Sequence, residues 1–152
     1  MDRVVELRIP ARPEFVGIAR MAVAALAGVR PGLAYERIDD LRIVVSEACT
    51  SAIEALSRGG ASGDAAHLVL RCHDGPKSLE IRIEAPAGAF EGAVPAVGSD
   101  VDVDDAFRIS LIRALVDDAE LRTATGGAEL CLVMHREANS EAANEEPGDL
   151  PA

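Results

Sequence analysis

Aromatic residues are scarce in this sequence, which has no Trp, one Tyr and three Phe among 152 residues. Its core must therefore be built from Ala, Val, Leu and Ile, and a chain of this length can bury such a core as one domain. Cysteine is scarce too, and three cysteines at irregular spacing do not make a disulfide framework. Cys72-His73, with Cys131 and His135, lacks the spacing of a zinc site. We therefore expect buried, apolar cysteines.

The chain also lacks a long apolar run and a basic amino terminus. No stretch approaches the length needed to cross a bilayer. Asp2 and Glu6 stand where a signal peptide would have its basic region. The sequence therefore predicts a cytoplasmic protein.

Positive charge is missing from the carboxyl end. The formal net charge is −11, and five acids but no base follow Arg136, namely Glu137, Glu141, Glu145, Glu146 and Asp149. This composition predicts a folded domain over 1–137 and a disordered acidic tail over 138–152. The acidic balance argues against nucleic acids and membranes as partners, because both need a positive surface, and favours protein partners.

Hydrophobic periodicity predicts five strands and three helices. Val5, Leu7 and Ile9 alternate with charged residues, which indicates a first strand, and apolar stripes indicate helices over 13–29, 35–58 and 104–117. The other strands are expected over 66–72, 78–85, 120–125 and 129–136, the last two joined at Gly126-Gly127. A long loop is expected over 86–103. The order β-α-α-β-β-α-β-β indicates an α+β domain with a mixed, mostly antiparallel sheet and helices on one face.

The segment Leu41-Arg-Ile-Val-Val-Ser-Glu-Ala-Cys-Thr-Ser-Ala-Ile-Glu54 resembles the signature helix of the RsbW-type serine-kinase anti-sigma factors. These are a branch of the GHKL ATPases, which include gyrase, MutL and histidine kinases, and their helix reads Ser-Glu-Ala-x-Thr-Asn-Ala. Ile9-Pro-Ala-Arg-Pro-Glu-Phe-Val-Gly-Ile-Ala-Arg20 is similar to the family's opening strand, proline and first helix. The resemblance implies a GHKL two-layer sandwich. It also implies a protein that holds a sigma factor away from RNA polymerase, or phosphorylates a serine of an antagonist with ATP and magnesium.

The resemblance assigns catalytic and metal positions to the signature helix. There the family uses a Glu to assist the attacking hydroxyl, and an Asn four residues later to hold magnesium. The matching residues are Glu47 and Ser51, which share one helix face. A serine hydroxyl can ligate magnesium, but it has a shorter reach than Asn. An ordinary solvated or capping acid is an equally good interpretation of Glu47.

The adenine and phosphate positions of the family match less well. Where the family has Asp-x-Gly after the third strand, this chain has Ala85 and Ala87, and Glu84 points to the opposite face. The glycine-rich lid is matched by Asp104-Asp-Ala-Phe-Arg108, in which Asp105 and Arg108 are charged. Aspartates at a helix start are ordinary caps and oppose phosphate binding. We therefore predict a degenerate site without a cofactor, with ATP and magnesium only if the site works.

The first predicted helix is apolar on nearly all sides, so a second surface is needed to cover it. We expect its core face to comprise Phe15, Ile18, Ala22 and Ala25 or Leu26. A partner-binding surface of Val16, Val23 and Ala24 around Arg20 then remains, unless the tail or the loop covers it. Arg20 matches a family arginine that meets the partner, and the resemblance implies a homodimer.

The leading interpretation is an anti-sigma regulatory factor that sequesters a sigma factor in a partner-switching system, with its kinase site lost. The alternative is an active ATP-dependent protein serine kinase that phosphorylates an anti-sigma-factor antagonist, with Glu47 as the base and Ser51 on magnesium. A GHKL-shaped interaction domain that serves another process is the third interpretation.

Overall fold

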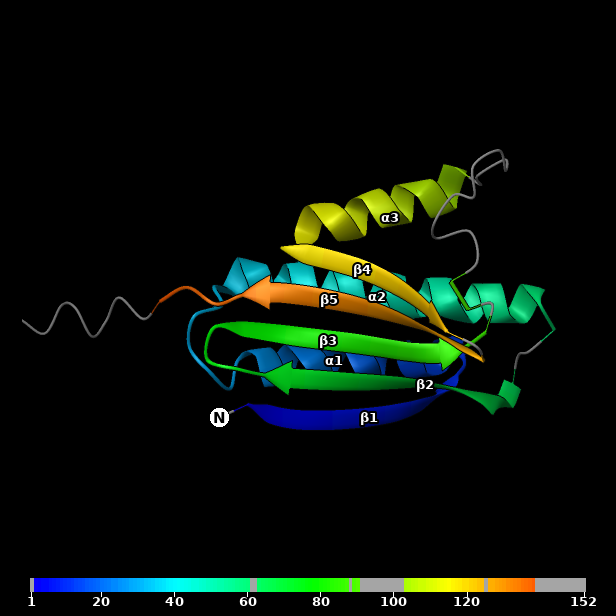
Figure 1. Ribbon diagram of the computed structural model, residues 1–152, viewed down its shortest axis with the longest axis horizontal. Coiled ribbons are helices and arrows are strands. Elements are labelled where there is room, and N and C mark those ends of the chain that lie inside the picture. The colour runs from blue at the N-terminus through cyan, green and yellow to red at the C-terminus, as the bar shows by residue number, and fades with distance from the viewer. Residues whose placement is uncertain (1, 61–62, 88, 91–102, 125, 139–152) are drawn as a thin grey trace, which may run out of the picture.

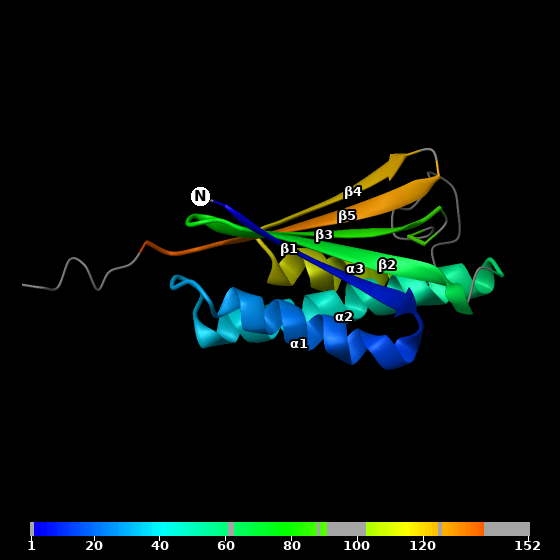
Figure 2. The same cartoon turned by 90° about the horizontal axis from the view of Figure 1, so that it is seen from below.

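The computed structural model describes residues 2–60, 63–87, 89–90, 103–124 and 126–138. Within these residues the strands are β1 (Arg3–Ala11), β2 (Gly63–Asp74), β3 (Ser78–Pro86), β4 (Asp118–Ala124) and β5 (Gly127–His135). The helices are α1 (Val16–Ala27), which follows the 3₁₀ turn Pro13–Phe15, α2 (Tyr35–Arg58) and α3 (Val103–Leu115). The strands form one sheet in the order β1-β2-β3-β5-β4, and the helices cover a single face of it (Figures 1 and 2). No helix in this described part is long and apolar enough to cross a membrane.

The predicted element order and two-layer α+β architecture are confirmed, and α2 has the predicted bounds. Every neighbouring strand pair among the described residues is antiparallel. The β4–β5 hairpin turns one residue earlier than predicted, because Gly127 already pairs with Ala124. Gly126 makes this turn with a φ of +88°, a conformation that costs glycine little. Most of the predicted 86–103 loop, and the predicted tail except Ala138, lie outside the described residues.

The core lies between the inner face of the sheet and α2. One apolar row crosses the whole sheet, where each residue is directly opposite the next: Leu7, Leu70, Ile83, Leu130 and Leu121. Strand alternation places every second side chain on this face. The predicted stripe of α2 is buried against it, including Leu41, Val45, Ala48, Ala52 and Leu56.

Helix α1 turns a different side to the core from the one predicted. Val16, Val23 and Ala24 are buried, whereas Ile18 is 50% exposed. The prediction that Val16, Val23 and Ala24 form a partner-binding surface is therefore wrong, while Arg20 is exposed as expected. The helix is apolar around most of its circumference, so periodicity alone leaves two candidate stripes. Packing against α2 decides between them.

A buried ion cluster ties both ends of the domain to its middle. The Asp74 carboxylate at the end of β2 accepts hydrogen bonds from Arg136 at 2.7 Å and from Arg3 and Arg30 at 3.1 Å each. The side chains of Asp74 and Arg136 are both fully buried. Arg136 also donates to the carbonyl oxygens of Ala27 and Arg30 at 3.2 and 3.0 Å. Such dense pairing offsets the cost of removing these charges from water.

Gly32 lets the chain after β5 pass close to the α1–α2 connection. Its φ is +106°, and a β-carbon at this position would lie 2.8 Å from the Glu137 carbonyl oxygen and 2.9 Å from Cβ of Arg136. The Glu137 amide donates to the Gly32 carbonyl at 2.8 Å. A residue without a side chain is therefore required where the ion cluster brings these segments together.

Removing one partner of the ion cluster should destabilise the fold strongly. Asp74→Asn leaves buried arginine charge without its counter-ion, so we expect the free energy of unfolding to fall by about 3–5 kcal/mol. Urea denaturation of the full chain measures the change. The matched control is Glu120→Gln, which removes a carboxylate that bonds Arg122 at 2.9 Å on the surface of β4. Solvent screens that pair, so the urea midpoint of Glu120→Gln should stay at the wild-type value. Equal midpoints for the two variants would contradict the role given to Asp74.

Candidate functional site

Three of the predicted site residues lie on α2 and α3, two helices that pack against each other. Glu47 and Ser51 of α2, with Glu54, occupy successive turns on one face of the helix, and all three are half-buried. Arg108, in the middle of α3, is half-buried as well. The site is therefore built by two helices.

Arg108 joins these helices through the carboxylates of α2. Its Nη1 donates to Oε2 of Glu54 at 2.5 Å, and its Nη2 donates to Oε1 at 3.3 Å, so the pair is bidentate. Its Nε lies 3.5 Å from Oε2 of Glu47. The hydrogen bond from Arg108 lowers the pKa of Glu54 below its ordinary value of 4.5, against the opposing effect of partial burial, and the charges of Arg108 and Arg58 add to this. A cation of the protein itself thus pairs with both acids of this helix face.

Sequence reasoning placed Arg108 near the site but missed Glu54. The signal was present, because Glu54 follows Glu47 by seven residues and therefore returns to the same side of the helix. Ser51, the predicted magnesium ligand, lies between the two acids. The hydroxyl of Ser46 is buried and has no hydrogen-bond partner in the described part of the chain.

The end of β3 offers no acid to an adenine ring. Ala85 is 8% exposed and continues the inward alternation of the strand, as predicted. Glu84 points to the other face of the sheet, where it bonds Arg71 at 2.5 Å. Beyond the strand, Ala89 and Phe90 are buried in the hydrophobic core. Apolar side chains therefore stand at and after the end of β3, where binding of an adenine ring would need a polar group.

The remaining predicted residues make no described contact with the site on α2 and α3. Ala87, at the position of the family's glycine, is exposed just after β3. Asp105 belongs to the first turn of α3, but its side chain lies outside the described residues. The predicted partner residue Arg20 lies on α1, which packs on α2 but is not one of the two helices that build the site.

Two described positions of the family's nucleotide site bear on ATP binding. Ala85 has a methyl group where the family has an acid, and the carboxylate of Glu47 has a cationic neighbour. The described residues hold no group of three or more His, Cys, Asp or Glu side chains that could bind a metal ion. The three cysteines are buried, as predicted, and burial raises the pKa of Cys49 to about 12 and that of Cys72 to about 11. These thiols therefore stay protonated at neutral pH and are poor metal ligands.

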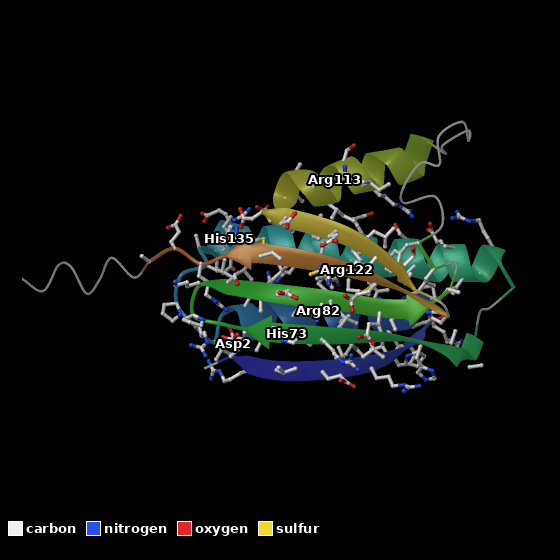
Figure 3. All side chains as sticks on the ribbon, viewed as in Figure 1. Asp2, His73, Arg82, Arg113, Arg122 and His135 are labelled. Atoms are coloured by element: carbon white, nitrogen blue, oxygen red, sulfur yellow. The ribbon has the colours of Figure 1, made fainter. Side chains whose placement is uncertain are left out.

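A separate hollow of about 660 Å³ lies on the polar face of the sheet. Arg8, Glu84, Arg122 and Glu129 are among its lining residues. Figure 3 shows the side chains of Arg82 and Arg122 on this face, which is turned away from the helices. Charges of opposite sign pair here, as Arg122 lies 3.7 Å from Glu129. The hollow therefore has no excess of one charge that would select a ligand.

Comparison with known proteins agrees with the fold and with the α2 signature. Residues 9–134 match the family of histidine kinase-like ATPase domains. The serine-protein kinase RsbW of Oceanobacillus iheyensis is 30% identical over 131 residues, or 80% of each chain. The protein of the same name from Listeria innocua is 30% identical over 130 residues, with the same coverage. The one from Bacillus pumilus is 41% identical over 90 residues, which are 58% of this chain and 53% of that relative. The chain therefore belongs to the histidine kinase-like ATPase domains and, within them, to the relatives of serine-protein kinase RsbW.

Titration with ATP and magnesium should show no tight binding. Each lost polar partner at a buried site costs about 1–3 kcal/mol, and 1.4 kcal/mol is about tenfold in affinity. Loss of the adenine acid together with the engagement of Glu47 predicts an affinity at least about a hundredfold weaker than that of an intact site. Isothermal titration calorimetry measures this affinity as a dissociation constant.

The matched variant carries Ala85→Asp and Ser51→Asn. It should not recover tight binding while Arg108 still pairs with the acids of α2. A dissociation constant in the low micromolar range for the wild-type chain would contradict the prediction.

Proposed function

We propose that this chain is an anti-sigma regulatory factor that acts by binding a sigma factor and does not transfer phosphate. Its family and the resemblance of its α2 segment support a regulator of this kind. The observation that carries the proposal is the contact of Arg108 with Glu47 and Glu54, together with an alanine at the adenine position. Glu47, the acid that a kinase would use on the attacking hydroxyl, is paired within the protein.

The exposed side of α1 offers the surface for a protein partner. Ile18 and Met21 are exposed three residues apart on one side of the helix, and Val29 is exposed just beyond its end. Arg20 is exposed next to this apolar stripe. A planar cation beside exposed apolar side chains has the composition of an interface hot spot. We therefore place partner recognition at Arg20 and this stripe.

The resemblance to the RsbW-type family also supports a proposal for the oligomeric state, the location and a second partner of the chain. The chain acts as a homodimer in the cytoplasm, and an antagonist protein competes with the sigma factor for it. Because no phosphate is transferred, the relative amounts and affinities of the two partners set which one is bound.

The second candidate function is an ATP-dependent protein serine kinase acting on the antagonist. Glu47 favours it, since this half-buried acid stands at the family's catalytic position and the relatives are named serine-protein kinases. The deciding experiment is a pull-down with the full chain from extract of its own cells, with and without ATP. A sigma factor retained without nucleotide supports the proposal, and phosphate transfer to a co-purified protein supports the kinase. If neither result is obtained, the chain is an interaction domain that serves another process.

Charge introduced on the outer side of α1 should weaken partner binding. Arg20→Glu and Met21→Glu should each cost about 2 kcal/mol, or about thirtyfold in affinity, because each removes a hot-spot contact. Both side chains are exposed, so the circular dichroism spectrum should not change. The matched control is Tyr35→Glu on α2, since Tyr35 is 72% exposed and Met21 is 71% exposed. Wild-type affinity in both well-folded α1 variants would place the interface elsewhere.

A further inference from the structure

Helix α3 has little apolar anchoring along the part whose side chains are described. Among residues 108–115 only Ile112 is buried, while Ser110, Arg113 and Ala114 are exposed. The helix lies at one side of the molecule, beside β4 and α2 (Figure 1). Because apolar burial is roughly proportional to area, residues 108–115 gain less from it than α2 does. Polar contacts therefore help to fix this part of the helix.

Two arginines supply these contacts, one in the middle of the helix and one at its carboxyl end. Arg37 of α2 donates to the carbonyl oxygen of Leu115 and to the carboxylate of Asp117, each at 3.0 Å. A cation at these last carbonyls also complements the helix dipole. In the middle of α3, Arg108 reaches across to Glu47 and Glu54. The helix is thus tied to α2 at its middle and at its carboxyl end by side chains of the chain itself.

The pairing of Arg108 differs from an ordinary surface ion pair. Its side chain is 22% exposed, compared with 45% for Glu54 and 34% for Glu47. Isolated exposed pairs contribute little to stability, whereas bidentate pairs and networks of several charges contribute more. One guanidinium shared by two carboxylates on the same helix face is such a network.

We infer that Arg108 is a positioning residue whose contacts with Glu47 and Glu54 hold the middle of α3 on α2, so that α3 keeps its place without a nucleotide. This inference rests on the proposed function, in which the chain binds its partner without ATP. It adds that an arginine of α3 itself fixes this helix in such a chain. Arg37 holds the carboxyl end, so loss of Arg108 frees the helix around residue 108 more than near Leu115.

Amide hydrogen exchange in the full-length chain, read by mass spectrometry, tests the inference. Arg108→Gln should raise the exchange rate of α3 around residue 108 at least about tenfold, with a smaller change near Leu115, where Arg37 still binds. Exchange in the sheet should not change. The matched control is Arg113→Gln, since Arg113 is an exposed arginine of the same helix (Figure 3). In the wild-type chain, ATP and magnesium at millimolar concentration should leave the exchange of α3 unchanged.

A double-mutant cycle separates the ion pair from other effects of the substitution. Glu54→Gln should raise the exchange of α3 in the same direction, and the double variant should exchange no faster than Arg108→Gln alone, since both changes break one contact. Equal exchange in Arg108→Gln and Arg113→Gln would overturn the inference, as would slower exchange of wild-type α3 on addition of ATP. Calorimetric ATP binding by a chain whose α3 still depends on Arg108 would instead overturn only the proposed function.

Discussion

The buried pair of Asp74 and Arg136 is the contact on which the arrangement of this domain depends. It joins the end of β2 to the segment after β5, and Arg136 also binds carbonyl oxygens at the end of α1 and in the connection to α2. Carbonyls at a helix end lack partners within the helix, so the arginine satisfies groups that would otherwise need water. Of its nitrogens, Nε has no partner within the described residues. By fixing the end of α1, the pair helps to decide which side of that helix faces the core and which side is left for a partner.

The α2–α3 contact shows how a neighbour changes the chemistry of a carboxylate. Glu47 lies in a signature that resembles a catalytic helix. In the structure this acid lies 3.5 Å from a guanidinium of α3, and Glu54 binds that guanidinium through both oxygens. The hydrogen bond from Arg108 lowers the pKa of Glu54. In our proposal both acids serve to position α3.

The two faces of the sheet differ in composition and in what they contact. The inner face carries the apolar rows that hold α1 and α2, while the outer face carries charges that mostly pair with one another. One outer row runs directly across all five described strands through Arg8, Val69, Glu84, Glu129 and Arg122. Glu84 and Glu129 are neighbours of like charge, which is unfavourable, and Arg71 and Arg122 offset it. Exposed large apolar side chains occur on β1 and α2 as well as on α1, where Ile18 and Met21 lie on both sides of the exposed Arg20 in sequence.

The sequence by itself determined the element order, the bounds of α2 and the inward alternation of β3 up to Ala85, because these follow from local periodicity and turn chemistry. The same local information also pointed to the family, through the residues around Glu47. It could not decide which stripe of α1 is buried, since both stripes are apolar. Nor could it show that Asp74 is a fully buried counter-ion, or that Glu54 binds Arg108. Those features depend on residues that are 54 to 62 positions apart in the chain, and only the packing of helices and strands brings such residues within hydrogen-bonding distance.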